Sequence, residues 1–266
     1  MAKDMDLEHA DFERLALEIV DSAEKSGIHL RLLGAVAFRI HCPVHQGLQI
    51  SMNRVLTDLD FAAYYKQEKA IDKFFLQEMA YESQTASLTP GLMLGRKIYN
   101  DPGDERPHID VFFDKLDMCH VVSWEKGRLE IDKPTITLAD LMLEKLQIVR
   151  INEKDVIDVM MLLREHDIGD SDNETVNGMY ISKLMAKDWG FYHTSTTNLT
   201  KVKSRLGDYD ALTSSDRDVV AGRIDELLDL IGKEPKSVGW KLRAKVGTKK
   251  QWYNDVEEVE RAEHLM

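Results

Sequence analysis

Hydrophobic residues along the chain follow two different spacings, and the change of spacing divides the sequence into two parts. In the first part, short apolar runs bounded by glycine, proline or polar turns alternate with amphipathic helical patterns. Strands are predicted at residues 28–33, 56–65, 92–99 and 108–113, and a hairpin at 120–131 with its turn at 125–127. Helices are predicted around residues 12–23, 35–42 and 71–79.

After Pro134 the apolar spacing becomes helical throughout. Thr137 is placed to cap a helix whose apolar residues run to Val149, and a second helix covers 156–163. Further helices are predicted near residues 176–188, 213–232 and 251–264. We therefore predict an α/β fold of the α+β kind. A mixed β-sheet flanked by helices forms a catalytic domain in residues 1–133, and a helical domain that binds an acceptor forms residues 134–266.

Composition limits the class of protein further. Of the 266 residues, 43% are hydrophobic, which is enough to bury a sizeable core. No apolar run approaches the roughly 18 residues that span a bilayer, and the acidic N-terminus lacks the apolar segment of a signal peptide. Cys42 and Cys119 lie far apart, which favours a reduced protein without a disulfide. We expect a cytoplasmic protein with no membrane partner.

The charge is strongly acidic overall but uneven along the chain. A net charge of -12 argues against a protein that coats nucleic acid nonspecifically. Residues 233–250 nevertheless concentrate lysine and arginine beside Trp240, Trp252 and Tyr253. This stretch is either a surface that holds a polyanion or a solvated helix face with packed rings.

Three aspartates carry the candidate chemistry. Asp58 and Asp60 are two residues apart in a predicted strand, so both carboxylates point to the same face. Two such acids on an apolar strand repel each other and lose hydration unless a cation neutralises them. Asp110 projects alone from the predicted strand 108–113. If the two strands are neighbours, the three carboxylates come within roughly 5 Å and could hold two divalent metals.

An Asp-x-Asp pair alone is common in turns and on edge strands, so its setting matters. Upstream lies a strand ending at Gly34 and a short helix beginning at Ala35, and downstream lies Asp110 on its own strand. This order resembles the nucleotidyltransferase superfamily with the DNA polymerase beta-like fold. Arg54, Thr57 and the helical segment from Leu141 to Asp158 make the chain resemble the abortive-infection toxin nucleotidyltransferases in particular.

The resemblance implies transfer of a nucleoside monophosphate from a nucleoside triphosphate, ATP among them, to a hydroxyl of an RNA, a protein or a small molecule. Mg²⁺, or Mn²⁺, would be the cofactor, held by Asp58, Asp60 and Asp110, with Asp110 helping to activate the hydroxyl. Likeness to the toxins extends the expectation to a toxin–antitoxin role with a partner protein.

The residues expected to contact the nucleotide are Gly34, Ala35, Arg54, Thr57 and Lys145. A glycine turn before a helix offers free backbone N–H groups to a phosphate. The chain departs from the family at Ala35, where glycine or serine is usual. Lys145 has an alternative role, which is to pair with Asp155 or Asp158 across a helix hairpin.

Ala35 also leaves open a rival interpretation, a catalytically silent nucleotide-binding or protein-interaction module on the same fold. Other chemistries have less support, since the chain has no P-loop, dinucleotide fingerprint or nucleophile elbow. A zinc site at His41, Cys42 and His45 is poorly supported because Pro43 breaks the helical relation of the two histidines.

Overall fold

The computed structural model describes residues 2–84 and 95–255, and side chains from residue 9 onward. The helices are α1 (Ala2–Lys25), α2 (Gly34–His41), α3 (Gly47–Ser51), α4 (Glu68–Lys73), α5 (Leu138–Leu146), α6 (Glu153–Glu165), α7 (Gly178–Met185), α8 (Trp189–Arg205), α9 (Ser214–Lys233) and α10 (Val238–Val246). The strands are β1 (Leu30–Leu33), β2 (Asp58–Ala63), β3 (Glu82–Ser83), β4 (Arg96–Asn100), β5 (His108–Phe113), β6 (Lys115–Asp117), β7 (Val121–Ser123), β8 (Ile168–Gly169) and β9 (Val176–Asn177).

The main sheet is mixed and has the strand order β1-β2-β5-β4-β3. Strands β2 and β5 run parallel at its centre, while the other neighbouring pairs are antiparallel. Leu59, Phe61, Ile109 and Val111 are fully buried on one face of the central pair. Because side chains alternate along a strand, the residues between them are directed to the opposite face, which is where the predicted acids lie.

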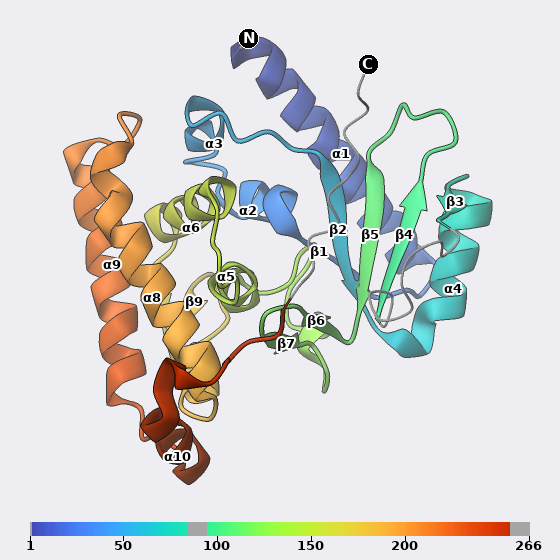
Figure 1. The fold of residues 1–266 in the computed structure, drawn as a ribbon. Helices are drawn as coiled ribbons and strands as arrows, with labels where there is room; N and C mark the ends of the chain where they lie inside the picture. Colours follow the sequence, from blue (N-terminus) through green and yellow to red (C-terminus); the bar gives the residue numbers. More distant parts are fainter. Residues whose placement is uncertain (1, 85–94, 256–266) are drawn as a thin grey trace.

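The helical half packs against the sheet through a continuous core. In Figure 1 the sheet lies on one side of the molecule and helices α8 and α9 on the other, with α2, α5 and α6 between them. Leu32 donates its N–H to the carbonyl of Pro134 and accepts the N–H of Ile136, so the chain enters the helical half beside β1. One cluster of buried apolar residues includes both Leu32 and Leu141. The division into two domains at residue 134 therefore stays a prediction.

The predicted fold class is confirmed, because the structure is a mixed sheet with flanking helices followed by a helical region. Strand 108–113 agrees with β5, and the predicted strands 28–33 and 56–65 contain β1 and β2. Residues 92–94 of the fourth predicted strand lie outside the described segments, and its remainder overlaps β4. Thr137 caps α5 as expected, since its side chain accepts the N–H of Asp140.

The predicted hairpin at 125–127 is wrong. Strand β7 pairs instead with β6, which precedes it, and residues 128–130 form a single 3₁₀ turn. Arg128 explains the difference, because its guanidinium binds Asp140 at 2.8 Å and Asp172 at 2.9 Å, both in the helical half. These ion pairs draw the segment after the turn away from β7. The sequence pattern contains no sign of them.

Helices α3, α8 and α10 were not predicted, and the predicted helix 251–264 is not found where the structure describes its residues. Helices α7 and α9 fall where the pattern predicts them, but residues 251–255 are not helical, and the rest of the predicted helix 251–264 lies outside the described segments. Helix α8 escapes prediction because its buried face includes the polar Thr194, Ser195 and Asn198 beside apolar residues. Helix α10 has no buried residue, so it has no apolar stripe to detect.

The described segments contain no helix with both the length and the apolar character required to cross a bilayer.

Two histidines that the fold largely removes from water have depressed pKa values. Burial lowers the pKa of His120 to about 4, and the nearby Asp188 opposes this only in part. Its Nε2 lies 2.8 Å from the hydroxyl of Thr194, and its ring stacks on Phe191. Burial, followed by the charge of His166, lowers the pKa of His41 to about 4 as well. Both rings are therefore neutral in the folded protein near pH 7.

We expect His120 to make the folded protein less stable as the pH falls from about 6.5 to about 4. In this window His120 binds a proton in the unfolded chain but not in the folded chain, so its contribution to the free energy of unfolding decreases with acidification. His120→Gln can still bond Thr194 but cannot titrate, and its loss of stability across the window should be smaller by about 1–2 kcal/mol. Urea unfolding at several pH values measures this. Equal losses in both proteins would contradict the prediction.

Candidate metal centre

The central strand pair brings the predicted acids together on one face of the sheet. Asp60 and Asp110 are direct cross-strand partners in the parallel pairing of β2 with β5, and Asp58 is opposite His108. Residues opposite each other in neighbouring strands point to the same face. The sequence-based expectation that β5 lies beside β2, with Asp110 next to the Asp58–Asp60 pair, is therefore confirmed.

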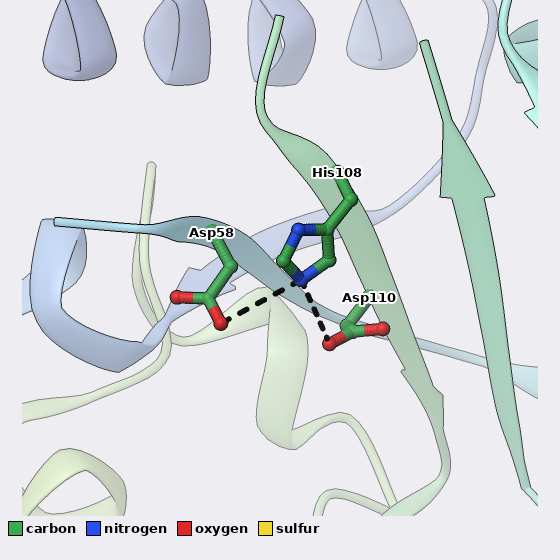
Figure 2. A group of neighbouring side chains, drawn as sticks. All are labelled: Asp58, His108 and Asp110. Atoms are coloured by element: carbon green, nitrogen blue, oxygen red, sulfur yellow. Dashed lines mark ion pairs between the residues drawn. The ribbon is translucent and has the colours of Figure 1, made fainter. Parts of the chain in front are cut away.

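Asp58, His108 and Asp110 form the candidate metal centre. One ligand atom from each lies within 4.8 Å of the other two. Nε2 of His108 is 3.6 Å from Oδ2 of Asp58 and 3.9 Å from Oδ2 of Asp110, so the imidazole nitrogen faces both carboxylates (Figure 2). Leu59 and Ile109 are buried on the opposite face of the two strands. Because side chains alternate along a strand, Asp58, His108 and Asp110 are all directed to the face that the centre occupies. Histidine was missing from the predicted ligand set.

Asp60 lies beside this group, against the glycine turn. A Cβ at residue 34 would clash with Oδ2 of Asp60, and Gly34 has a φ of +72°, in the left-handed region that favours glycine. Burial raises the pKa of Asp60 well above its usual range, as do the charges of Asp58, Asp110 and Glu144, while Lys145 opposes them. The carboxylate of Asp60 thus lies where negative charge is concentrated and water is scarce.

Arg96 on β4 provides a cation that the sequence did not reveal. Its Nε donates to Oδ1 of Asp110 over 3.3 Å and its Nη2 donates to Oδ2 over 2.6 Å. The side chain of Asp110 is only 3% exposed and that of Arg96 29% exposed. The guanidinium also lies over the ring of Phe112. Asp110 therefore has a bidentate partner, and a metal at this carboxylate would share it with Arg96.

We expect Arg96→Gln to destabilise the metal-free protein and to strengthen its response to metal. Loss of the guanidinium removes the charged donors to a buried carboxylate, at a cost of about 1–3 kcal/mol. The uncompensated Asp110 should then bind a divalent cation more tightly, so added MnCl₂ should raise the melting temperature more than in wild type. Arg205→Gln, which removes an exposed ion pair with Glu153, is the matched control. An unchanged response to MnCl₂ in Arg96→Gln would contradict the prediction.

The glycine turn is less open to phosphate than the sequence predicted. The N–H of Gly34 donates to Oε2 of Glu144 over 3.0 Å, in a buried position. Ala35 follows in the first turn of α2, and its carbonyl accepts from the amide of Gln49. A phosphate at this turn would have to replace the Glu144 carboxylate as acceptor for Gly34. The prediction that Gly34 offers a free N–H is therefore corrected.

Lys145 lies within a buried group of charges rather than at an open cleft. Its Nζ is 2.9 Å from Glu144, 3.3 Å from Asp155 and 3.4 Å from Asp158. Burial alone would lower the pKa of Lys145, but these carboxylates outweigh it and raise the pKa. The alternative role stated for Lys145, pairing with Asp155 or Asp158 across the helix hairpin, is the one that the structure has.

Arg54 belongs to the same group of charges. Its Nε donates to Oδ1 of Asp158 over 3.2 Å and its Nη2 to Oδ2 over 3.1 Å. Arg54 is 7% exposed and Asp158 is fully buried, so this bidentate pair is shielded from solvent. The placement argues against the predicted phosphate contact of Arg54 and favours a role in joining β2 to α6. Thr57, by contrast, is exposed and donates its hydroxyl to Oδ1 of Asp58.

The residues of the zinc site suggested by the sequence have other environments. His45 binds Glu165 at 2.5 Å, and burial raises the pKa of the Cys42 thiol. In the segments 9–84 and 95–255, only Asp58, His108 and Asp110 form a group of histidine, cysteine or acidic residues that could hold a metal. The zinc interpretation at residues 41–45 is therefore not supported.

In the basic stretch, the rings predicted to interleave with lysines pack against helix α8. Trp252 meets the ring of His193 edge-on at 5.0 Å, and Trp240 meets Tyr192 at 5.1 Å. The exposed lysines of this stretch are Lys233, Lys241, Lys245, Lys249 and Lys250. A solvated face with packed rings describes this arrangement, and polyanion binding stays a prediction.

The donor chemistry of the centre fits a divalent cation. Carboxylate oxygens and an imidazole nitrogen are established protein ligands for such ions, and the distances among them require only a small contraction. Burial is the main cause of the raised pKa of Asp60 and the neighbouring carboxylates are the next, and a cation here would relieve this second cause. Asp58 and His108 have side chains 30% and 20% exposed, so the centre is open to solvent on their side.

His108, Arg96 and Glu144 are the residues that sequence reasoning missed. His108 precedes Asp110 by two residues, as Asp58 precedes Asp60, so the same alternation rule could have found it. Arg96 and Glu144 give no such sign. Arg96 reaches Asp110 through the antiparallel pairing of β4 with β5, and Glu144 reaches Gly34 from a helix 110 residues away in sequence.

Comparisons with known proteins do not add to this geometry, since no family model and no curated protein matches the chain.

Proposed function

We propose that the protein is a metal-dependent nucleotidyltransferase that moves a nucleoside monophosphate from a nucleoside triphosphate to a hydroxyl. The observation that carries the proposal is the in-register pairing of Asp60 with Asp110, with Asp58 and His108 as the next pair on the same face of these strands. Three carboxylates and an imidazole on one sheet face, beside a glycine turn, form a site suited to phosphoryl chemistry with a divalent cation. The donor base and the toxin role stay predictions.

In this reaction the acceptor oxygen forms a bond to the α-phosphorus, and the bond from that phosphorus to the bridging oxygen of the pyrophosphate breaks. Pyrophosphate leaves with the electron pair, and the hydroxyl proton passes to a carboxylate of the site or to water. A divalent cation bound by these residues would lower the pKa of the hydroxyl and neutralise the triphosphate. Asp58 and Asp110 would hold that cation, while Asp60 would contribute the third negative charge.

The protein's own cations are placed to assist. Arg96 is held at the edge of the centre by Asp110, with 29% of its side chain exposed. An incoming triphosphate offers the guanidinium more negative charge than one carboxylate does, and a bidentate contact suits phosphate oxygens. Arg96 therefore replaces Arg54 and Lys145 as the candidate phosphate contact, because the latter two are enclosed among carboxylates. The acceptor, whether RNA, protein or small molecule, stays open.

The test is a labelling experiment with purified protein, cell extract and a divalent cation. Triphosphates labelled at the α-phosphorus should transfer their label to an acceptor, whereas those labelled at the γ-phosphorus should release it as pyrophosphate. Ribonuclease and protease treatment of the product then identifies the acceptor class. Asp58→Ala and Asp60→Ala should abolish the α-label, while Asp218→Ala on the exposed face of α9 should not. Labelling that persists in both site variants, or none in wild type, would sink the proposal.

One observation favours the rival function, a catalytically silent module. The carboxylate of Asp110 already has Arg96 as its cation, and the N–H of Gly34 already has Glu144 as its acceptor. A module of this kind would bind nucleotide without needing metal. Calorimetry with a non-hydrolysable triphosphate separates the two, since binding of equal strength with and without Mg²⁺ or Mn²⁺ supports the silent module.

A further inference from the structure

The histidine among the carboxylates changes which metal the centre would prefer. Mg²⁺ takes oxygen ligands almost exclusively and demands near-ideal octahedral geometry. Imidazole nitrogen suits first-row transition metals, and carboxylate and phosphate oxygens suit Mg²⁺ and Mn²⁺ alike. Nε2 of His108 lies 3.6 Å from Asp58 and 3.9 Å from Asp110, within the same group of ligand atoms. A purely oxygen site is therefore not what these strands present.

We infer that the centre takes Mn²⁺, or a closely similar first-row divalent cation, in preference to Mg²⁺, with His108 as a nitrogen ligand beside Asp58 and Asp110. The inference rests on the metal site of the proposed function and deepens it. Mn²⁺ takes the carboxylate and phosphate oxygens that Mg²⁺ takes, and as a first-row transition metal it also accepts an imidazole nitrogen. The preference comes from one side chain, which makes it testable by substitution.

The fold holds His108 in the orientation that this role needs. Its Cα is the direct cross-strand partner of Asp58, two residues along β5 from the pair formed by Asp60 and Asp110. The imidazole therefore extends between the two carboxylates, as Figure 2 shows. Asp110 forms the buried back of the centre, 3% exposed, and the 20% exposed His108 forms part of its solvent side. An ion arriving from solvent would meet Asp58 and His108 first.

A different role for His108 predicts the opposite result. If the imidazole carried a proton and served only to neutralise the two aspartates, it would repel an arriving cation. Its removal would then strengthen the binding of Mn²⁺ and Mg²⁺ alike. If it is a ligand, its removal weakens Mn²⁺ binding and leaves Mg²⁺ binding nearly unchanged.

The first experiment titrates the full-length protein with MnCl₂ or MgCl₂ in a calorimeter. Loss of groups that only support metal ligands already costs about 10–100-fold in affinity, so loss of a ligand itself in His108→Asn should cost Mn²⁺ at least about tenfold. Asparagine keeps an oxygen at this position, so Mg²⁺ affinity should stay close to that of wild type. His45→Asn is the matched control, because His45 binds Glu165 outside the centre. Its affinities for both ions should equal those of wild type.

The second experiment reads the coordination directly. Electron spin echo spectroscopy of bound Mn²⁺ should show modulation from a histidine nitrogen in wild type and in His45→Asn, and none in His108→Asn. Equal affinities of wild type for the two ions, tighter binding by His108→Asn, or absence of nitrogen modulation would each overturn the inference.

The two proposals fail separately. Nucleotide transfer that Mg²⁺ supports as well as Mn²⁺, without nitrogen modulation, removes the inference and leaves the transferase. Mn²⁺ bound through His108 without any nucleotide transfer retains the inference and removes the transferase.

Discussion

Asp60→Asn should abolish nucleotide transfer and at the same time make the metal-free protein more stable. The carboxylate of Asp60 is half-buried, and its removal from water, followed by the charges of Asp58, Asp110 and Glu144, raises its pKa. An amide of the same shape removes the repulsion and can donate to one of these neighbours. We expect the free energy of unfolding near pH 7 to rise by about 1–2 kcal/mol, because functional sites commonly sacrifice stability of this size.

The loss of activity follows from the same substitution, since an amide cannot supply negative charge to a metal or to a developing charge at the reaction centre. The rate of transfer should fall by about 10³-fold or more. Asp218→Asn, on the exposed face of α9, is the matched control for the change in net charge from its value of -12. It should alter neither activity nor stability appreciably.

The pH dependence of Asp60→Asn provides an independent check. Folding raises the pKa of Asp60 above 3.8, so the folded state binds this proton more tightly than the unfolded state does. The stabilisation that this bound proton provides is lost as the pH rises from below 3.8 through the folded pKa. Asparagine does not titrate, so the variant does not show this loss. The stability gain of Asp60→Asn should therefore be small in acid and full near neutrality. A variant less stable than wild type near pH 7 would show that the carboxylate is compensated in the folded protein.

Asp158→Ala should be the most damaging single substitution for stability. Asp158 is fully buried and binds Arg54 with both oxygens, and its Oδ2 is 3.4 Å from Nζ of Lys145. Its removal leaves the guanidinium of Arg54 without a carboxylate partner in a position where water cannot replace it. Breaking a buried ion pair in this way costs about 3–5 kcal/mol, so the urea midpoint should fall sharply.

The matched control is Asp225→Ala on α9, where Asp225 binds Lys203 at 2.6 Å on the surface. Exposed pairs contribute about 0–1 kcal/mol, so this variant should unfold nearly as wild type does. Combining Arg54→Ala with Asp158→Ala should cost less than the sum of the two single changes, because the double variant leaves neither charge unpaired. Additive losses would show that Arg54 and Asp158 do not depend on each other.

The charge group around Asp158 also shows where sequence reasoning went astray. Arg54 lies four residues before Asp58 and Lys145 follows the sheet, so both resembled phosphate ligands. Arg54 pairs with Asp158 on α6, and Lys145 pairs with Glu144 on α5 and with Asp155 on α6. Helix α6 packs against α5 and α2, and the low exposure of that packing forces the cations to pair internally. A linear sequence gives the charge of a side chain but not the distance to its neutralising partner.

Alternation along strands was enough for the sequence alone to place Asp58 and Asp60 on one face, to put Asp110 on its own strand, and to indicate a mixed sheet followed by helices. These properties depend on local periodicity, which each residue and its near neighbours set. The tertiary structure alone decided that His108 faces two carboxylates, that Arg96 holds Asp110, and that Glu144 takes the N–H of Gly34. Those contacts depend on strand register and helix packing between distant segments, where many arrangements satisfy the same local pattern.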